Sequence, residues 1–121
     1  MNKDDLCFLP ATELLGLIVK RQLSPVELMD AVLGRIEALE PKLNAFATLT
    51  AEAAMDGAKA AEAKLATGEP LGPLHGLPVT IKDLAVTAGI ATERGSHTQR
   101  GTVPAISPRA RPDWFKGWRL A

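Results

Sequence analysis

The residues with the clearest chemical potential lie in the stretch GPLHGLPVTIKDL at positions 72–84. Lys82 and Asp83 come at the end of a short β-branched run, which follows a loop of glycines and prolines. A lysine is a base only in its neutral form, so its ordinary pKa of about 10.4 must fall through burial or nearby positive charge. By local sequence alone, a charged residue at the end of a strand is more often solvated than catalytic. Asp83 is suited to orienting backbone amides or pairing with a cation, and equally to capping a turn.

Ser96 and Cys7 are the other candidates for a nucleophile. Ser96 comes fourteen residues after Lys82 without a Ser-x-x-Lys motif, and the Gly-Ser pair at 95–96 favours a turn or a cap. Cys7 is the only cysteine and has no nearby acid–base partner, so we expect a small hydrophobic side chain or an unreactive thiol. A single cysteine and an N-terminus without a secretory signal pattern favour a cytoplasmic protein.

No pattern in the chain indicates binding of a metal, a cofactor, a nucleic acid or a membrane. His75 and His97 lie far apart, without a second ligand at the spacing of a zinc site. The glycines form neither a Gly-x-Gly-x-x-Gly motif nor a P-loop, so we expect no cofactor. The formal net charge of zero argues against a nucleic-acid or membrane-surface partner. The apolar run at 14–19 is too short to span a bilayer.

A helix that starts with a capping box is the clearest predicted element. The 121 residues are enough for one small domain, and 46% hydrophobic composition is typical of a globular chain. Ser24, Pro25 and Glu27 occupy the N-cap, first and third positions of the helix. Apolar residues then recur at three- and four-residue steps, which predicts ordinary core packing on that face. Pro41 is predicted to end the helix.

Two further helices are expected, one on each side of the first. The segment 11–22 is predicted to be helical, with Thr12 as its cap and one apolar face. Thr50 is predicted to cap a third helix at 51–66, which ends at Gly68. The narrow apolar stripe of the third helix consists largely of alanine, and we expect these small side chains to allow close approach to a sheet. The stripe comprises Ala54, Ala58, Ala61 and Leu65.

Two short strands complete the predicted elements. The segment 44–49 follows the capped helix, and the segment 77–81 leads directly to Lys82. Both are bounded by turn-forming residues, and the second is rich in β-branched side chains. About three helices and one or two strands predict an α/β fold.

The chain changes character near residue 105. The last sixteen residues, 106–121, hold four cations and one aspartate, a net charge of +3, and both tryptophans. No helical or strand period organises them. We therefore expect a folded part at 1–105 and a basic, aromatic and disordered tail at 106–121.

Two long passages, LSPVELMDAVLGRIEALEPKLNAFATL and GPLHGLPVTIKDLAVTAGIATERGS, resemble the amidase signature family, in the same order and at the same spacing. The resemblance covers roughly 10–105. It implies the N-terminal part of a large α/β domain built around a mixed, twisted sheet. It also implies cleavage of carbon–nitrogen bonds in small-molecule amides by a Ser–Ser–Lys triad. The resemblance places the catalytic lysine at Lys82 and a supporting residue at Asp83.

The sequence also departs from the family pattern. The family's two serines lie in a loop of the Gly-Gly-Ser-Ser-Gly-Gly type, which the 121 residues do not contain. The resemblance therefore implies a truncated chain that is inactive alone. Family members that act on charged tRNA often read Ile-Lys-Asp-Asn, whereas Leu84 follows the aspartate here, which favours a general amidase.

Two other interpretations remain open at this point. The chain is alternatively a helical interaction module or a subunit that docks on a complete amidase or amidotransferase. A small independent enzyme that uses Lys82 with Ser96 is the third possibility, and the turn-like setting of Ser96 disfavours it.

Overall fold

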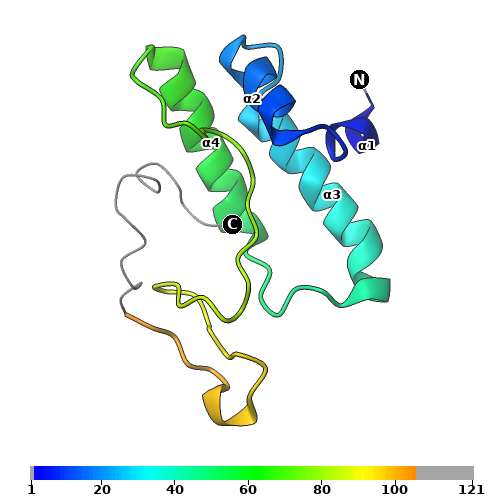
Figure 1. The fold of residues 1–121 in the computed structure, drawn as a ribbon, viewed down its shortest axis with the longest axis vertical. Coiled ribbons are helices and arrows are strands. Elements are labelled where there is room, and N and C mark those ends of the chain that lie inside the picture. Colours follow the sequence, from blue (N-terminus) through cyan, green and yellow to red (C-terminus); the bar gives the residue numbers. More distant parts are fainter. Residues whose placement is uncertain (1, 106–121) are drawn as a thin grey trace.

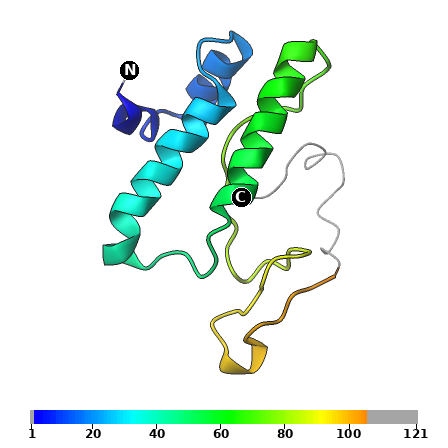
Figure 2. The ribbon, with the colours of Figure 1, turned by 180° about the vertical axis from the view of Figure 1, so that it is seen from behind.

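A computed structural model describes residues 2–105 of the chain, and these residues form a small helical bundle followed by irregular backbone. The tail predicted at 106–121 lies outside the described residues. The two longest helices, Pro25–Leu43 and Ala51–Thr67, lie side by side. The short helix Lys3–Leu6 lies beside Pro25–Leu43 on the side away from Ala51–Thr67, and the helix Ala11–Val19 lies at the N-terminal end of Pro25–Leu43 (Figures 1 and 2). The helices are α1 (Lys3–Leu6), α2 (Ala11–Val19), α3 (Pro25–Leu43), α4 (Ala51–Thr67) and the short 3-10 helix η1 (His97–Gln99).

The predicted α/β fold is wrong for this part of the chain, because residues 2–105 contain helices and no strand. Both segments expected as strands, 44–49 and 77–81, run as irregular backbone. A strand needs backbone hydrogen bonds to a neighbouring strand, whatever its own composition. Within the described residues, neither segment donates a backbone hydrogen bond to the other. The β-branched composition of 79–81 was therefore insufficient to create a sheet.

The capping box predicted at the start of α3 is confirmed. The Ser24 hydroxyl accepts hydrogen bonds from the Val26 and Glu27 N–H groups, at 3.0 and 3.4 Å. The Glu27 carboxylate accepts from the Ser24 N–H at 3.0 Å. The prediction that Pro41 ends the helix is wrong, since α3 continues to Leu43. Pro41 has no N–H group, so the last turn lacks one backbone hydrogen bond. The loss is tolerated there because the Asn44 N–H still donates to the Glu40 carbonyl oxygen.

The ends of the other helices agree in part with the prediction. Gly68 ends α4 in a left-handed conformation with φ of +75°, as expected for a glycine C-cap. The helix predicted at 11–22 ends earlier, at Val19, and Pro10 rather than Thr12 occupies its N-cap. Arg21 has a φ of +57°, so the chain leaves the helical conformation before Gln22.

Two small clusters of apolar side chains hold the bundle together. In one of them, Ala54 and Ala58 of α4 pack against Met29 of α3. The alanine stripe thus brings α4 close to another helix rather than to the expected sheet. The other cluster joins α1, α2 and α3, and Ile18 and Leu28 are almost completely buried in it. Its buried members are Leu6, Leu14, Ile18, Leu23, Leu28 and Ala31.

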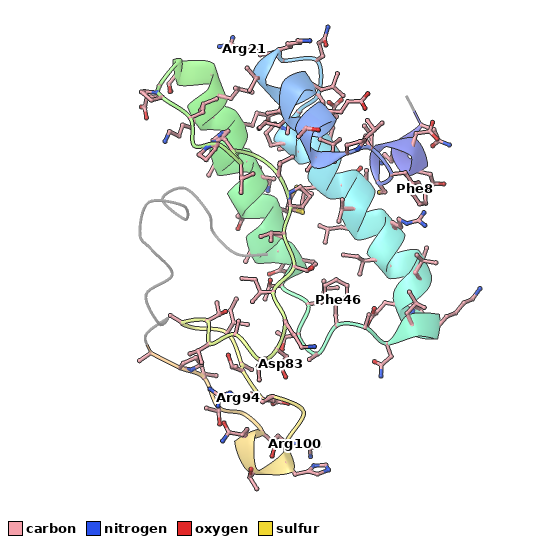
Figure 3. All side chains as sticks on the ribbon, viewed as in Figure 1. Phe8, Arg21, Phe46, Asp83, Arg94 and Arg100 are labelled. Carbon is pink, nitrogen blue, oxygen red and sulfur yellow. The ribbon has the colours of Figure 1, made fainter. Side chains whose placement is uncertain are left out.

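The chain after α4 runs back along the two long helices and then forms a set of loops beyond their far ends (Figure 1). The segment 77–82 contains no helix, turn or bend and connects the bundle to the loops of 83–105. Figure 3 places Asp83, Arg94 and Arg100 among these loops, at the opposite end from Arg21. Within residues 2–105, no helix has the length and apolar character needed to cross a membrane.

Candidate active site

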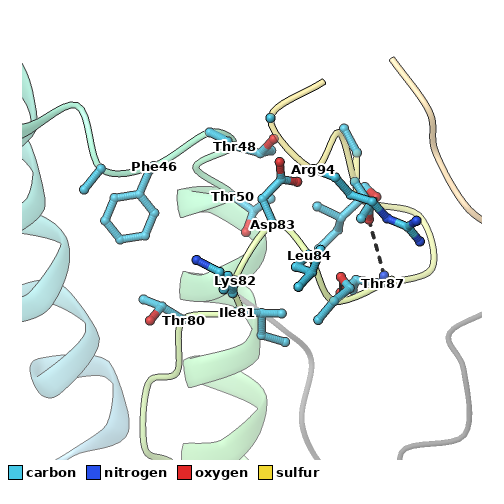
Figure 4. Close-up of a pocket in the computed structure, with 17 residues that line it drawn as sticks. Phe46, Thr48, Thr50, Thr80, Ile81, Lys82, Asp83, Leu84, Thr87 and Arg94 are labelled. Atoms are coloured by element: carbon cyan, nitrogen blue, oxygen red, sulfur yellow. Dashed lines mark hydrogen bonds between the residues drawn. The ribbon is translucent and has the colours of Figure 1, made fainter. Parts of the chain in front are cut away.

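Lys82 lines an open groove, at the end of the segment that leaves the bundle (Figure 4). Its side chain is exposed, and its ammonium group has no hydrogen bond or ion pair with the described residues. Figure 4 shows Lys82 extending toward the side of Phe46, whereas Asp83 extends toward the segment that carries Arg94. The prediction that Lys82 stands at the end of a short strand is wrong, because the segment 77–81 before it is irregular backbone.

The loop before this segment is fixed to the helices by a tight turn at 73–76. The buried His75 ring donates from Nε2 to the Ala61 carbonyl oxygen of α4, over 2.8 Å. Gly76 has a φ of +77°, and a Cβ atom there would lie 2.9 Å from Cγ of Pro25. Only glycine combines this backbone conformation with such a close approach. The bundle thus determines where the segment that presents Lys82 begins.

Asp83 holds the loops on the far side of the groove. Its Oδ1 accepts a hydrogen bond from the Glu93 N–H at 3.0 Å. The Glu93 carboxylate in turn accepts from the Gly101 N–H at 2.8 Å. Of the roles that the sequence left open, Asp83 therefore makes the contact with a backbone amide. The carboxylates of Asp83 and Glu93 thus hold the loops between Asp83 and Gly101 together through backbone N–H groups.

The groove has a volume of about 810 Å³ and is open to solvent. Its lining combines one carboxylate, two cations and several threonine hydroxyls with apolar side chains from the segments at 45–47 and 81–91. A lysine base requires burial or nearby positive charge, and the described residues leave Lys82 exposed. The chemically relevant lining residues are Thr48, Thr50, Thr80, Lys82, Asp83, Thr87, Thr92 and Arg94.

The other candidate residues lie in structural positions. Ser96 is the N-cap of η1, and its hydroxyl is 2.8 Å from that of Thr98, which agrees with the predicted turn or cap. Cys7 is half-buried and packs against the first core cluster. His97 is exposed at the start of η1. Among residues 2–105, no three His, Cys, Asp or Glu side chains gather as potential metal ligands.

Sequence reasoning missed the structural roles of His75, Gly76 and Glu93. The contact between His75 and α4 joins residues fourteen positions apart across a loop, and no local pattern indicates it. A glycine in a loop indicates a positive φ, so the backbone conformation of Gly76 had a local signal. Its close approach to Pro25 had none, because it depends on how the turn packs on α3.

Comparison with known proteins decides the family. A model of the Amidase family matches residues 27–107, which is more than half of the chain. The chain belongs to the amidase family. The match includes α4, most of α3, the tight turn at 73–76, Lys82 and the groove.

Curated amidase-family relatives match most of this chain with a small part of their own length. A glutamyl-tRNA(Gln) amidotransferase subunit of Salinispora arenicola is 44% identical over 100 residues, which are 83% of this chain and 20% of the relative. The corresponding protein of Nostoc punctiforme is 48% identical over 93 residues, 77% of this chain and 19% of the relative. The chain thus spans about a fifth of the length of these relatives.

Solved structures show the same arrangement of helices and loops as one part of a larger chain. Two of them, one with a bound inhibitor, concern a vestigial protein complex that reveals the evolutionary origins of an s-triazine catabolic enzyme. Each has a chain that is 33% identical to this one, with a TM-score of 0.74. The likeness covers 80% of this chain and 21% of the solved chain.

Proposed function

We propose that residues 2–105 form the N-terminal part of an amide-hydrolysing site, in which Lys82 is the lysine of a Ser–Ser–Lys triad. The observation that carries the proposal is the position of Lys82 in a chain of the amidase family. Lys82 lines a groove of about 810 Å³, on a segment that the bundle anchors through His75 and Gly76. Such anchoring gives a catalytic group the fixed geometry that it needs.

The chemistry assigns separate roles to the groups of such a site. An amide is a poor electrophile, so its cleavage requires an activated nucleophile, a proton donor for the leaving amine and donors for the oxyanion. Lys82 supplies the base in this proposal, and Asp83 supports it by fixing the opposite loop through the Glu93 N–H. Neither a Gly-Gly-Ser-Ser-Gly-Gly loop nor a cover over Lys82 is present in the described residues. We therefore propose that the 121 residues alone do not cleave amides.

The substrate class in this proposal is a small-molecule amide. The exposed Leu84 lines the groove directly after Asp83, where family members that act on charged tRNA often carry asparagine, and this favours general amide hydrolysis. The second candidate is ammonia transfer from an amide, since the relatives at 44% and 48% identity are tRNA amidotransferase subunits. Glutaminase activity that depends on a tRNA partner would favour the second candidate.

A covalent chimera tests the role of Lys82. The 100 matching residues of the Salinispora arenicola relative are replaced by those of this chain, and hydrolysis of glutamine and of simple aryl and aliphatic amides is measured. We expect an active chimera whose kcat falls about 10²- to 10⁴-fold in Lys82→Ala, as for loss of a general base. Lys20→Ala, at the exposed end of α2, is the matched control and retains the activity. An active chimera that tolerates Lys82→Ala would refute the proposal.

A further inference from the structure

A small, largely apolar cleft lies beside the groove. It has a volume of about 270 Å³, and none of the described residues that line it is charged. Figure 4 shows Phe46 and Thr80, which line both hollows, on the side of the groove toward α3. Leu49, which also lines the cleft, is 47% exposed. Exposed apolar side chains around a hollow indicate a binding surface. The other apolar lining residues are Met29, Val32, Leu33, Ile36, Ala54, Pro78 and Val79.

The Thr50 hydroxyl indicates which chemical groups fit this cleft. Thr50 lines it, and its hydroxyl oxygen is buried without a hydrogen-bond partner among the described residues. Thr50 is the N-cap residue of α4, but its side chain makes no capping hydrogen bond. Because buried hydroxyls normally have a partner, the cleft fits an occupant that combines apolar surface with a hydrogen-bond donor. An indole ring has both properties.

The tail at 106–121 contains two indole rings, and the chain that leads to it is held beside the groove. The Pro104 carbonyl oxygen accepts a hydrogen bond from the Gly89 N–H at 2.9 Å. Gly89 belongs to the loops that line the groove. Trp114 comes ten residues after Pro104, and ten extended residues span about 33 Å. The tail is therefore long enough to reach across the groove to the adjoining cleft.

The composition of the tail also suits the cleft. The tail holds Trp114, Phe115 and Trp118 together with a net charge of +3. Tryptophan and arginine are enriched at the energetic centres of protein interfaces. Since the whole chain has no net charge, the residues before the tail carry a net charge of −3. Part of that negative charge lies next to the cleft, because the Glu40 carboxylate accepts from the Phe46 N–H at 2.8 Å.

We propose that the tail folds back in the free chain and covers the cleft. One tryptophan ring packs against Ile36 and Leu49, and its indole N–H donates to the Thr50 hydroxyl. The groove itself is a poorer site for the tail, because Lys82 and Arg94 line it and repel the tail's cations. Since the tail belongs to the same polypeptide, its effective concentration at the cleft is about millimolar, so a weak contact is sufficient. The inference is independent of the proposed function, because it concerns the free chain and not catalysis.

Tryptophan fluorescence of the intact chain tests the inference, because both tryptophans lie in the tail. The emission maximum and the quenching by acrylamide are measured for the folded chain and for the same chain unfolded in urea. We expect the folded chain to emit at a shorter wavelength and to be quenched less, since a docked ring is shielded from water. The shift should not depend on protein concentration, and sedimentation should show a monomer, since the tail and the cleft belong to one chain.

Three variants change the cleft. Leu49→Lys and Ile36→Lys each place a charge at it, and neither side chain belongs to the two core clusters. An unpaired charge next to a buried ring is unfavourable, so each variant should return the emission to that of the unfolded chain at unchanged helical circular dichroism. Thr50→Val removes the acceptor and should lower the ratio of docked to free tail about two- to tenfold. Val19→Lys is the matched control, since Val19 is 57% exposed on α2, and it should leave the emission unchanged.

Other results would overturn the inference. Equal emission from the folded and the unfolded chain would show that the tail does not dock. A shift that survives both Leu49→Lys and Ile36→Lys would place the tail elsewhere on the molecule. A shift that appears only at high protein concentration, together with a sedimenting dimer, would show that the tail binds a second copy. Unchanged emission in Thr50→Val would refute the hydrogen bond to that hydroxyl.

Discussion

Replacing Gly76 by alanine tests whether the helices fix the loop that leads to Lys82. The new Cβ atom would lie 2.9 Å from Cγ and 3.3 Å from Cβ of Pro25. Pro25 is among the most completely buried side chains, and its ring is bonded to the backbone at the start of α3, which restricts its movement. Overpacking of this kind costs about 1–3 kcal/mol. The left-handed conformation, with φ of +77°, adds about 1–2 kcal/mol for a non-glycine residue.

Gly89 provides the matched control for this substitution. Its φ is also +77°, but a Cβ atom there would meet nothing within 4 Å. Gly89→Ala should therefore destabilise by only about 1–2 kcal/mol, against about 2–5 kcal/mol for Gly76→Ala. The difference between the two variants isolates the contact with Pro25.

Urea denaturation followed by circular dichroism at 222 nm measures both variants against the unmodified chain. With a slope of about 1–3 kcal/mol per molar urea, the midpoint of Gly76→Ala should lie about 1 M below that of Gly89→Ala. Equal midpoints would refute the reasoning, because they would show that the turn at 73–76 does not pack on α3 in solution.

Two further predictions concern the core and the loops of the groove. Leu28 is 1% exposed, so Leu28→Ala should destabilise the bundle by about 2–5 kcal/mol in the same urea experiment. Leu43→Ala, at a position 64% exposed, should change the stability by less than about 0.5 kcal/mol, and a similar loss in both variants would contradict the described core. Asp83→Ala removes the acceptor of the Glu93 N–H, so hydrogen exchange at Glu93 should accelerate about ten- to a hundredfold. Asp83→Asn keeps an oxygen acceptor and should give a smaller effect, and unchanged exchange in Asp83→Ala would show that the contact is not made.

Local chemistry made the helices predictable. Ser24 and Glu27 satisfy each other's backbone groups within one turn, so their spacing alone identifies the start of α3. Gly68 ends α4 because glycine tolerates a left-handed conformation, which is again a local property. Pro41 was misleading because its effect depends on its distance from the end of the helix.

The strands and the loop contacts depend on residues that are distant in the sequence. Val79, Thr80 and Ile81 have the composition of a strand, but a sheet also requires a partner, and residues 2–105 supply none. The candidate role of Lys82 as a catalytic lysine was predicted from the resemblance to the amidase family. Its exposure in the groove became visible only in three dimensions. The contact of His75 with the Ala61 carbonyl was unpredictable because no local pattern specifies which backbone acceptor a buried ring reaches.

The most direct test of the central claim is the kcat of the covalent chimera with Lys82 and with Lys82→Ala. We predict amide hydrolysis with the lysine present and a decrease of about 10²- to 10⁴-fold with alanine, at unchanged helical content. Equal kcat values for the two chimeras would contradict the account, since they would show that Lys82 is not the base of the site.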